Sequence, residues 1–240
     1  MKSAAGMATD EAEALRSPIG REGELRELEG HLDALETGNS AFLEIVGEPG
    51  IGKTTLLTSL RERADRRGVL VLGGRASQFE NDIPFDPFVD ALDDYLATVN
   101  PRRLAPLGEE RIAELAVAFP SLMAIARERP SLAAQERCQI HWAVRSLLGL
   151  IGSAKPLVLT IDDAQWSDQP SLELLRHLVR RPPPAAVMVA IAFRTGTMPD
   201  SWHVLADAAL RAGDLARLEV GPSTGGTPRP LSEIRSPTRN

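Results

Sequence analysis

The sequence has little of what crosslinked, metal-held or membrane-spanning proteins need. A single cysteine, Cys138, rules out an internal disulfide, and the four histidines are scattered without the spacing of metal ligands. No apolar run approaches the roughly 18 residues required to span a bilayer, and the N-terminal segment lacks the apolar centre of a signal peptide. We therefore expect a cytoplasmic protein with no structural zinc and no membrane partner.

An excess of positive charge is also missing. Lysine and arginine number 27 against 33 aspartates and glutamates, which gives a net charge of −6 at pH 7. Surfaces devoted to nucleic acid are usually basic, so this balance argues against direct, specific DNA binding, although it leaves room for a local basic patch.

Apolar residues, by contrast, are plentiful. They make up 43% of the 240 residues, enough for one large α/β domain. Small polar residues fill positions 1–17, and Gly, Pro, Ser and Thr dominate positions 221–240. We expect a disordered leader over 1–17, one domain over 18–220 and a disordered tail over 221–240.

Five short apolar runs predict strands, at residues 41–46, 69–74, 156–161, 185–193 and 215–220. Helical patterns lie between them. The longest, residues 86–152, predicts a helical insertion between the second and third strands, with Pro101, Pro120 and Pro130 as punctuation. Strands that alternate with helices predict an α/β fold, here a five-stranded parallel sheet flanked by helices.

The stretch GEPGIGKTT follows the first strand and opens a helix, and it matches the pattern G-x-x-x-x-G-K-[ST] in full. Glycines let successive N–H groups point at one anion, and the start of the helix adds its positive dipole end. Lys53 would contact the β- and γ-phosphates of ATP, and the Thr54 hydroxyl would ligate Mg²⁺. The strand-turn-helix context disfavours the alternative, a flexible turn with a chance lysine. The predicted nucleotide contacts are Gly47, Glu48, Pro49, Gly50, Ile51, Gly52, Lys53, Thr54 and Thr55.

Charged residues follow two later strands at the same edge of the predicted sheet. Asp162 would hold Mg²⁺, and Asp163 would orient or deprotonate an attacking water. Taken alone, such a pair is more often a helix N-cap. Arg194 ends the next strand, where a cation would sense the γ-phosphate, and an ordinary surface arginine is the open alternative.

Five segments in this order, PIGREGEL, GEPGIGKTTLL, GRASQFENDIPFDPFVDAL, LVLTIDDAQWSD and AIAFRTG, resemble the AAA-type ATPase domain of the signal-transduction NTPases called STAND proteins. The nearest likeness is to large ATP-binding LuxR-type transcriptional regulators and to the ATPase region of soluble adenylyl cyclases. The resemblance covers about residues 18–220 and implies a P-loop NTPase fold of the AAA/ASCE type. It implies that the Arg194 strand lies between the two motif strands, that Arg194 is a sensor, and that Gly20 and Arg21 lie by the adenine. Arg75, in the GRAS element, receives no role.

Such proteins continue into a helical lid and often a DNA-binding helix-turn-helix, and no such pattern follows residue 220 here. We therefore expect a truncated or diverged regulatory module that exchanges ATP and ADP, hydrolyses ATP slowly, and has a second copy or a regulatory protein as its partner. Two alternatives stay open. One is a small-molecule kinase, which would need a pocket for its acceptor, and residues 86–152 show no cluster of polar residues of that kind. The other is a non-catalytic nucleotide-binding remnant.

Overall fold

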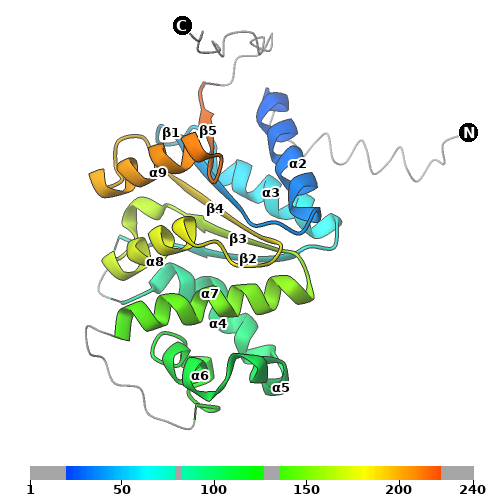
Figure 1. Cartoon of the computed structure of the whole chain (residues 1–240). Helices are drawn as coiled ribbons and strands as arrows, with labels where there is room; N and C mark the ends of the chain where they lie inside the picture. The colour runs from blue at the N-terminus through cyan, green and yellow to red at the C-terminus, as the bar shows by residue number, and fades with distance from the viewer. Residues whose placement is uncertain (1–19, 79–82, 127–135, 223–240) are drawn as a thin grey trace, which may run out of the picture.

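The centre of the fold is a five-stranded parallel sheet (Figure 1). The computed structural model describes residues 20–78, 83–126 and 136–222. The strands, in the spatial order β2-β3-β4-β1-β5, are β1 (Ala41–Gly47), β2 (Leu70–Arg75), β3 (Leu157–Asp162), β4 (Val187–Arg194) and β5 (Ala216–Val220). The predicted sheet is confirmed, and β4 lies between β1 and β3 as expected. The predicted leader, nearly all of the predicted tail and Pro130 lie outside the described residues.

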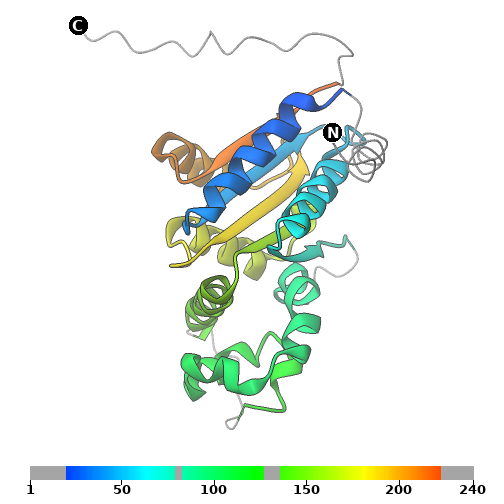
Figure 2. The same ribbon diagram turned by 90° about the vertical axis from the view of Figure 1, so that its right-hand side faces the viewer.

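Helices cover both faces of the sheet (Figures 1 and 2). Alternate side chains of β4 point to two separate apolar clusters, with Val189 and Ile191 in one and Met188 and Ala190 in the other. The second cluster lies under α2 (Glu22–Glu36) and α3 (Lys53–Arg66), and the first under α4 (Asp86–Thr98), α7 (Glu136–Ala154), α8 (Gln169–Arg180) and α9 (Asp200–Ala212). Because both of their faces are buried, the central strands β1, β3 and β4 read in the sequence as mostly apolar runs.

The predicted helical insertion lies between β2 and β3. It comprises α4, α5 (Pro101–Leu104), α6 (Glu109–Leu115) and α7, with short 3₁₀ turns at Ala105–Leu107 and Pro120–Leu122. α4 approaches β2 closely: a Cβ on Gly74 would lie 2.1 Å from the Pro87 carbonyl oxygen, so only glycine fits there. This contact fixes the start of α4 beside the carboxyl end of the sheet. Among the described helices, none combines the length and apolar character of a membrane span.

A charged side chain lies wholly inside the domain. Glu44 of β1 is 0% exposed, and its two carboxylate oxygens accept hydrogen bonds from Trp202 Nε1 at 2.6 Å and Arg217 Nε at 2.7 Å. A buried carboxylate is tolerated only when its partners satisfy it. The three residues therefore tie β1 to α9 and β5.

We expect Trp202→Phe to lower the free energy of unfolding by about 1–3 kcal/mol, since it leaves one oxygen of a buried carboxylate without its donor. Urea denaturation would measure the loss. Trp142→Phe is the matched control, because Trp142 is 40% exposed and outside this network. Equal losses in the two variants would contradict the role given to Glu44.

Candidate functional site

The glycine-rich stretch turns the chain from β1 into α3 at the carboxyl edge of the sheet. Gly52, the N-cap of α3, has a φ of 107°, a left-handed conformation that favours glycine. Gly47 is required for a different reason, because a Cβ there would lie 2.7 Å from the Val220 carbonyl oxygen. The first N–H groups of a helix have no partner within it. Those of α3 border a hollow of about 320 Å³ at the loop, a favourable place for an anion.

Lys53 places its ammonium group inside this loop. Its side chain is 7% exposed, and Nζ donates to the carbonyl oxygens of Gly47 and Glu48, both at 2.9 Å. Desolvation by burial lowers the pKa of Lys53, and the nearby aspartates Asp163 and Asp162 oppose the shift. The loop thus holds a cation next to the N-terminus of α3, as the motif predicts.

Thr54 and Asp162 meet at the floor of the hollow. Thr54 Oγ1 donates to Asp162 Oδ2 at 2.7 Å, and the other carboxylate oxygen accepts from the Asp163 N–H at 2.9 Å. A hydroxyl oxygen next to a buried carboxylate is the kind of ligand set that Mg²⁺ prefers. The residues present therefore fit the predicted Mg²⁺ site.

Neither aspartate caps α8 through its side chain, although Asp163 occupies the N-cap position of the 3₁₀ turn Ala164–Trp166 without a side-chain capping hydrogen bond. The carboxylate that caps α8 belongs to Asp168, which accepts from the Ser171 N–H at 2.9 Å. The same Asp168 oxygen accepts from the Phe85 N–H at 3.0 Å. Asp168 therefore joins the loop before α4 to the start of α8.

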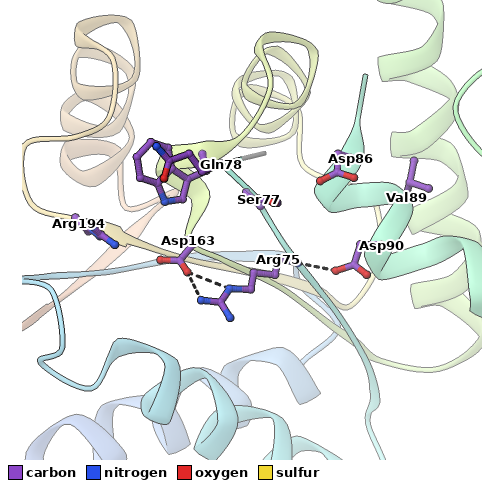
Figure 3. A pocket seen from close by; sticks show the side chains of 10 residues that line it. Arg75, Ser77, Gln78, Asp86, Val89, Asp90, Asp163 and Arg194 are labelled. Atoms are coloured by element: carbon purple, nitrogen blue, oxygen red, sulfur yellow. Dashed lines mark hydrogen bonds and ion pairs between the residues drawn. The ribbon is translucent and has the colours of Figure 1, made fainter. Parts of the chain in front are cut away.

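Two side chains, Arg75 and Gln165, hold Asp163, and Figure 3 shows the contact with Arg75. Oδ2 of Asp163 accepts from Arg75 at 2.6 Å (Nη2) and 3.0 Å (Nε), and its Oδ1 accepts from Gln165 Nε2 at 2.9 Å. Burial by itself would raise the pKa of Asp163, but the hydrogen bonds from Arg75 and Gln165 outweigh it and the pKa is lowered. Asp163 is thus a carboxylate held in its ionised, weakly basic form.

Arg75 and Gln165 are functional-site residues that the sequence reasoning missed. Arg75 ends β2 and its side chain is 68% exposed. In the sequence, the GRAS element was the one feature that marked Arg75, and no role could be assigned to that element. Gln165 also accepts from the Arg194 N–H at 3.2 Å, so it links the ends of β3 and β4. Nothing in the sequence marked Gln165 beyond its place in DDAQWSD.

Arg194 lies at the same edge, at the end of β4. Its guanidinium is 5.9 Å from the centre of the Trp166 ring. Arg194 also lines the hollow at the glycine loop (the phosphate hollow), together with Arg75 and Asp163. These three residues also line an adjacent chamber of about 660 Å³ (Figure 3). The remaining walls of the chamber are Ala76, Ser77, Gln78, Asp86, Val89, Asp90 and Trp166.

The N-terminal segment lies against the glycine loop. Arg21 is buried, and its guanidinium donates to the Ile51 carbonyl oxygen at 2.9 Å and to Glu24 Oε1 at 2.8 Å. Gly20 precedes it with a φ of 76°. The structure therefore joins Arg21 to the loop itself, and the predicted place of Gly20 and Arg21 beside the adenine stays a prediction.

Comparison with known proteins finds a family model that matches most of this chain. A family model described as "AAA ATPase domain" matches residues 17–190, which include the glycine loop, Arg75 and both aspartates. No curated protein matches the chain in sequence.

Similar solved structures include the Aeropyrum pernix Orc1 protein in complex with DNA, at 15% identity and a TM-score of 0.46 over 85% of this chain and 46% of that one. Cdc6p from Pyrobaculum aerophilum is 16% identical, with a TM-score of 0.47 over 88% of this chain and 49% of that one. The chain thus spans about half the length of these two proteins. At such scores the likeness carries no argument about function, and the assignment rests on the family match.

Proposed function

The chain belongs to the AAA ATPase domain family, and we propose that it binds Mg-ATP at Gly47–Thr55 and acts as a nucleotide-dependent regulatory switch with slow hydrolysis. The contact between Thr54 Oγ1 and Asp162 Oδ2 carries the proposal, because it joins the glycine loop to the β3 aspartates beside the Lys53 ammonium. The finer type, a STAND or LuxR-type regulator, is part of the proposal. We also propose that its partners are ATP and ADP and a regulatory protein or a second copy of the chain, and that it binds no specific DNA.

Each residue has a distinct task in this proposal. The N–H groups at the start of α3 and the Lys53 ammonium bind phosphate oxygens, while Thr54 and Asp162 hold the metal ion. Mg²⁺, when bound, stabilises the negative charge of the phosphates. Asp163 orients the attacking water, and Arg194 senses the γ-phosphate.

The contacts of Asp163 support slow hydrolysis. Both of its carboxylate oxygens already accept hydrogen bonds, from Arg75 and Gln165, and its lowered pKa makes it a weak base. Oδ2, which accepts both hydrogen bonds from Arg75, becomes open to a water only when Asp163 leaves Arg75. The pair therefore provides two arrangements, one engaged with Arg75 and one free, whose balance a nucleotide or partner would shift.

We expect Arg75→Ala to raise steady-state phosphate release about two- to fivefold. An exposed ion pair contributes about 0.2–1 kcal/mol, and its loss frees Asp163 and raises the pKa of its carboxyl group. Phosphate release at saturating ATP would measure the effect, across a series of protein concentrations that also reports self-association. Arg102→Ala, at an exposed arginine of α5, is the control.

A fall in release in Arg75→Ala would instead make Arg75 a participant in hydrolysis, and an unchanged rate would remove the pair from the switch. Wild-type turnover of about 1 per second or more in dilute protein, an ordinary enzyme rate, would contradict slow hydrolysis. ATP binding without any turnover in either protein would favour the non-catalytic remnant.

The chamber next to the phosphate hollow favours a small-molecule kinase as a second candidate. Residues 86–152 alone show no clustered polar set, but the fold brings Asp86 and Asp90 of α4 together with Ser77 and Gln78 from the segment after β2. Such a chamber is large enough for a small acceptor. The two functions separate in one assay: with candidate acceptors present, a kinase consumes ATP without releasing an equal amount of phosphate.

A further inference from the structure

A basic pocket lies between α7 and α8, apart from the glycine loop. It has a volume of about 400 Å³ and is lined by His141, Glu173, Arg176, His177, Arg180 and Arg181. None of these residues lines the phosphate hollow or the chamber beside it. The proposed ATPase therefore leaves this pocket without a role.

The positive charge of the pocket is not neutralised by the protein. Within the described ranges, Arg176, Arg180 and Arg181 form no ion pair with an acid. Glu173 is the one acid in the lining, and it accepts a hydrogen bond from Gln169 Nε2 at 3.1 Å. Three arginines clustered around one pocket without an acidic partner in the described part of the chain make it a favourable place for an anionic ligand.

An exposed tryptophan, Trp142, contacts one arginine of the pocket, Arg181, and the neighbouring Arg145. The guanidinium carbons of Arg181 and Arg145 lie 4.9 and 5.6 Å from the Trp142 ring centre. Arg145 Nε also donates to the Arg181 and Pro182 carbonyl oxygens, at 2.9 and 3.0 Å. Arginines restrained in this way lose less side-chain entropy when they bind a ligand.

His177 does not add to this charge at neutral pH. Desolvation by burial, together with the electrostatic effects of His141, Arg181 and Arg145, lowers the pKa of His177 to about 4. His177 is therefore neutral near pH 7. The binding charge of the pocket comes from the arginines, whose planar forks match carboxylates.

We propose that this pocket is a docking site for an acidic peptide segment of a partner protein. Arg176 and Arg180 lie one helical turn apart on α8, and Arg181 follows, so the cations form a row suited to carboxylates spaced along a chain. Tryptophan and arginine are the residue types that dominate protein–protein contacts.

Nucleic acid fits this pocket less well. The Trp142 ring already contacts two guanidiniums and His177, whose ring centre is 4.9 Å away, so it is no open platform for stacked bases. A duplex would also extend past the pocket over the surface of a chain with a net charge of −6.

Fluorescence anisotropy with a labelled octaglutamate peptide tests the proposal, at low salt, first without and then with excess Mg-ATP. We expect the wild-type chain to bind the peptide and the double variant Arg176→Glu, Arg180→Glu to bind it at least about tenfold more weakly. Arg102→Glu, Arg103→Glu is the matched control, since it makes the same charge change on exposed residues of α5. The double variant Arg176→Gln, Arg180→Gln should lose an intermediate amount of peptide affinity. It controls for misfolding of the charge-reversed glutamate variant.

Four results would overturn the proposal. The first is that the wild type does not bind the peptide, and the second is that the α8 and α5 variants lose equal amounts of peptide affinity. The third is that Mg-ATP releases the peptide, which would place the peptide at the glycine loop. The fourth is preference for another anion: tighter binding of labelled DNA through the same arginines, or binding of tripolyphosphate that the peptide cannot displace.

Discussion

Replacing Lys53 by Ala is expected to weaken ATP binding by more than about tenfold, which corresponds to about 1.4 kcal/mol. The ammonium is buried in the loop and bonded to the Gly47 and Glu48 carbonyl oxygens, next to the N-terminus of α3. Its loss leaves the phosphate oxygens with the helix N–H groups and with Arg75 and Arg194, which line the outer part of the same hollow. Isothermal titration calorimetry with Mg-ATP would measure the change.

Lys155→Ala is the control for this experiment. Lys155 is an exposed lysine just after α7, at the opposite end of β3 from the glycine loop, and its loss changes the net charge equally. We expect this variant to bind ATP like the wild type. If Lys53→Ala also kept the wild-type affinity, the glycine loop would not be the nucleotide site.

The two adjacent aspartates are expected to separate binding from chemistry. Asp163→Asn should keep the ATP affinity and abolish phosphate release, because an amide cannot accept the proton of the attacking water. Asp163 has a left-handed φ of 52°, which asparagine also adopts readily, so the backbone should be preserved. Phosphate release, measured in the wild type and in the faster Arg75→Ala background, would report the loss.

Asp162→Asn should instead damage the Mg²⁺ dependence of ATP binding. Its carboxylate contacts the Thr54 hydroxyl, and an amide at this position removes the negative charge that would hold the metal ion. Titration of ATP binding against Mg²⁺ compares the two variants directly. Unchanged turnover in Asp163→Asn would leave that residue with only a structural role.

The sequence alone determined the features of this protein that depend on residues close together in the chain. The five strands were predicted from short segments bounded by turn residues. The three central strands, β1, β3 and β4, are buried on both faces and therefore read as mostly apolar runs. The glycine loop was readable because its backbone turn and its lysine lie within nine residues, from Gly47 to Thr55. The apolar face of α7 from Ile140 to Ile151 was likewise predicted and is buried, since its period is that of a helix.

The partners of the charged residues were decided by the tertiary structure alone. The register of β2 on β3 places Arg75 opposite Asp162 and so within reach of Asp163, 88 positions away in the chain. Gln165 bonds across to β4, and the basic pocket forms only where α7 and α8 lie side by side. Local periodicity specifies that a strand or helix exists, but not which strand becomes its neighbour or in what register. Strand order and register arise from packing over the whole core, and they decide which distant side chains meet.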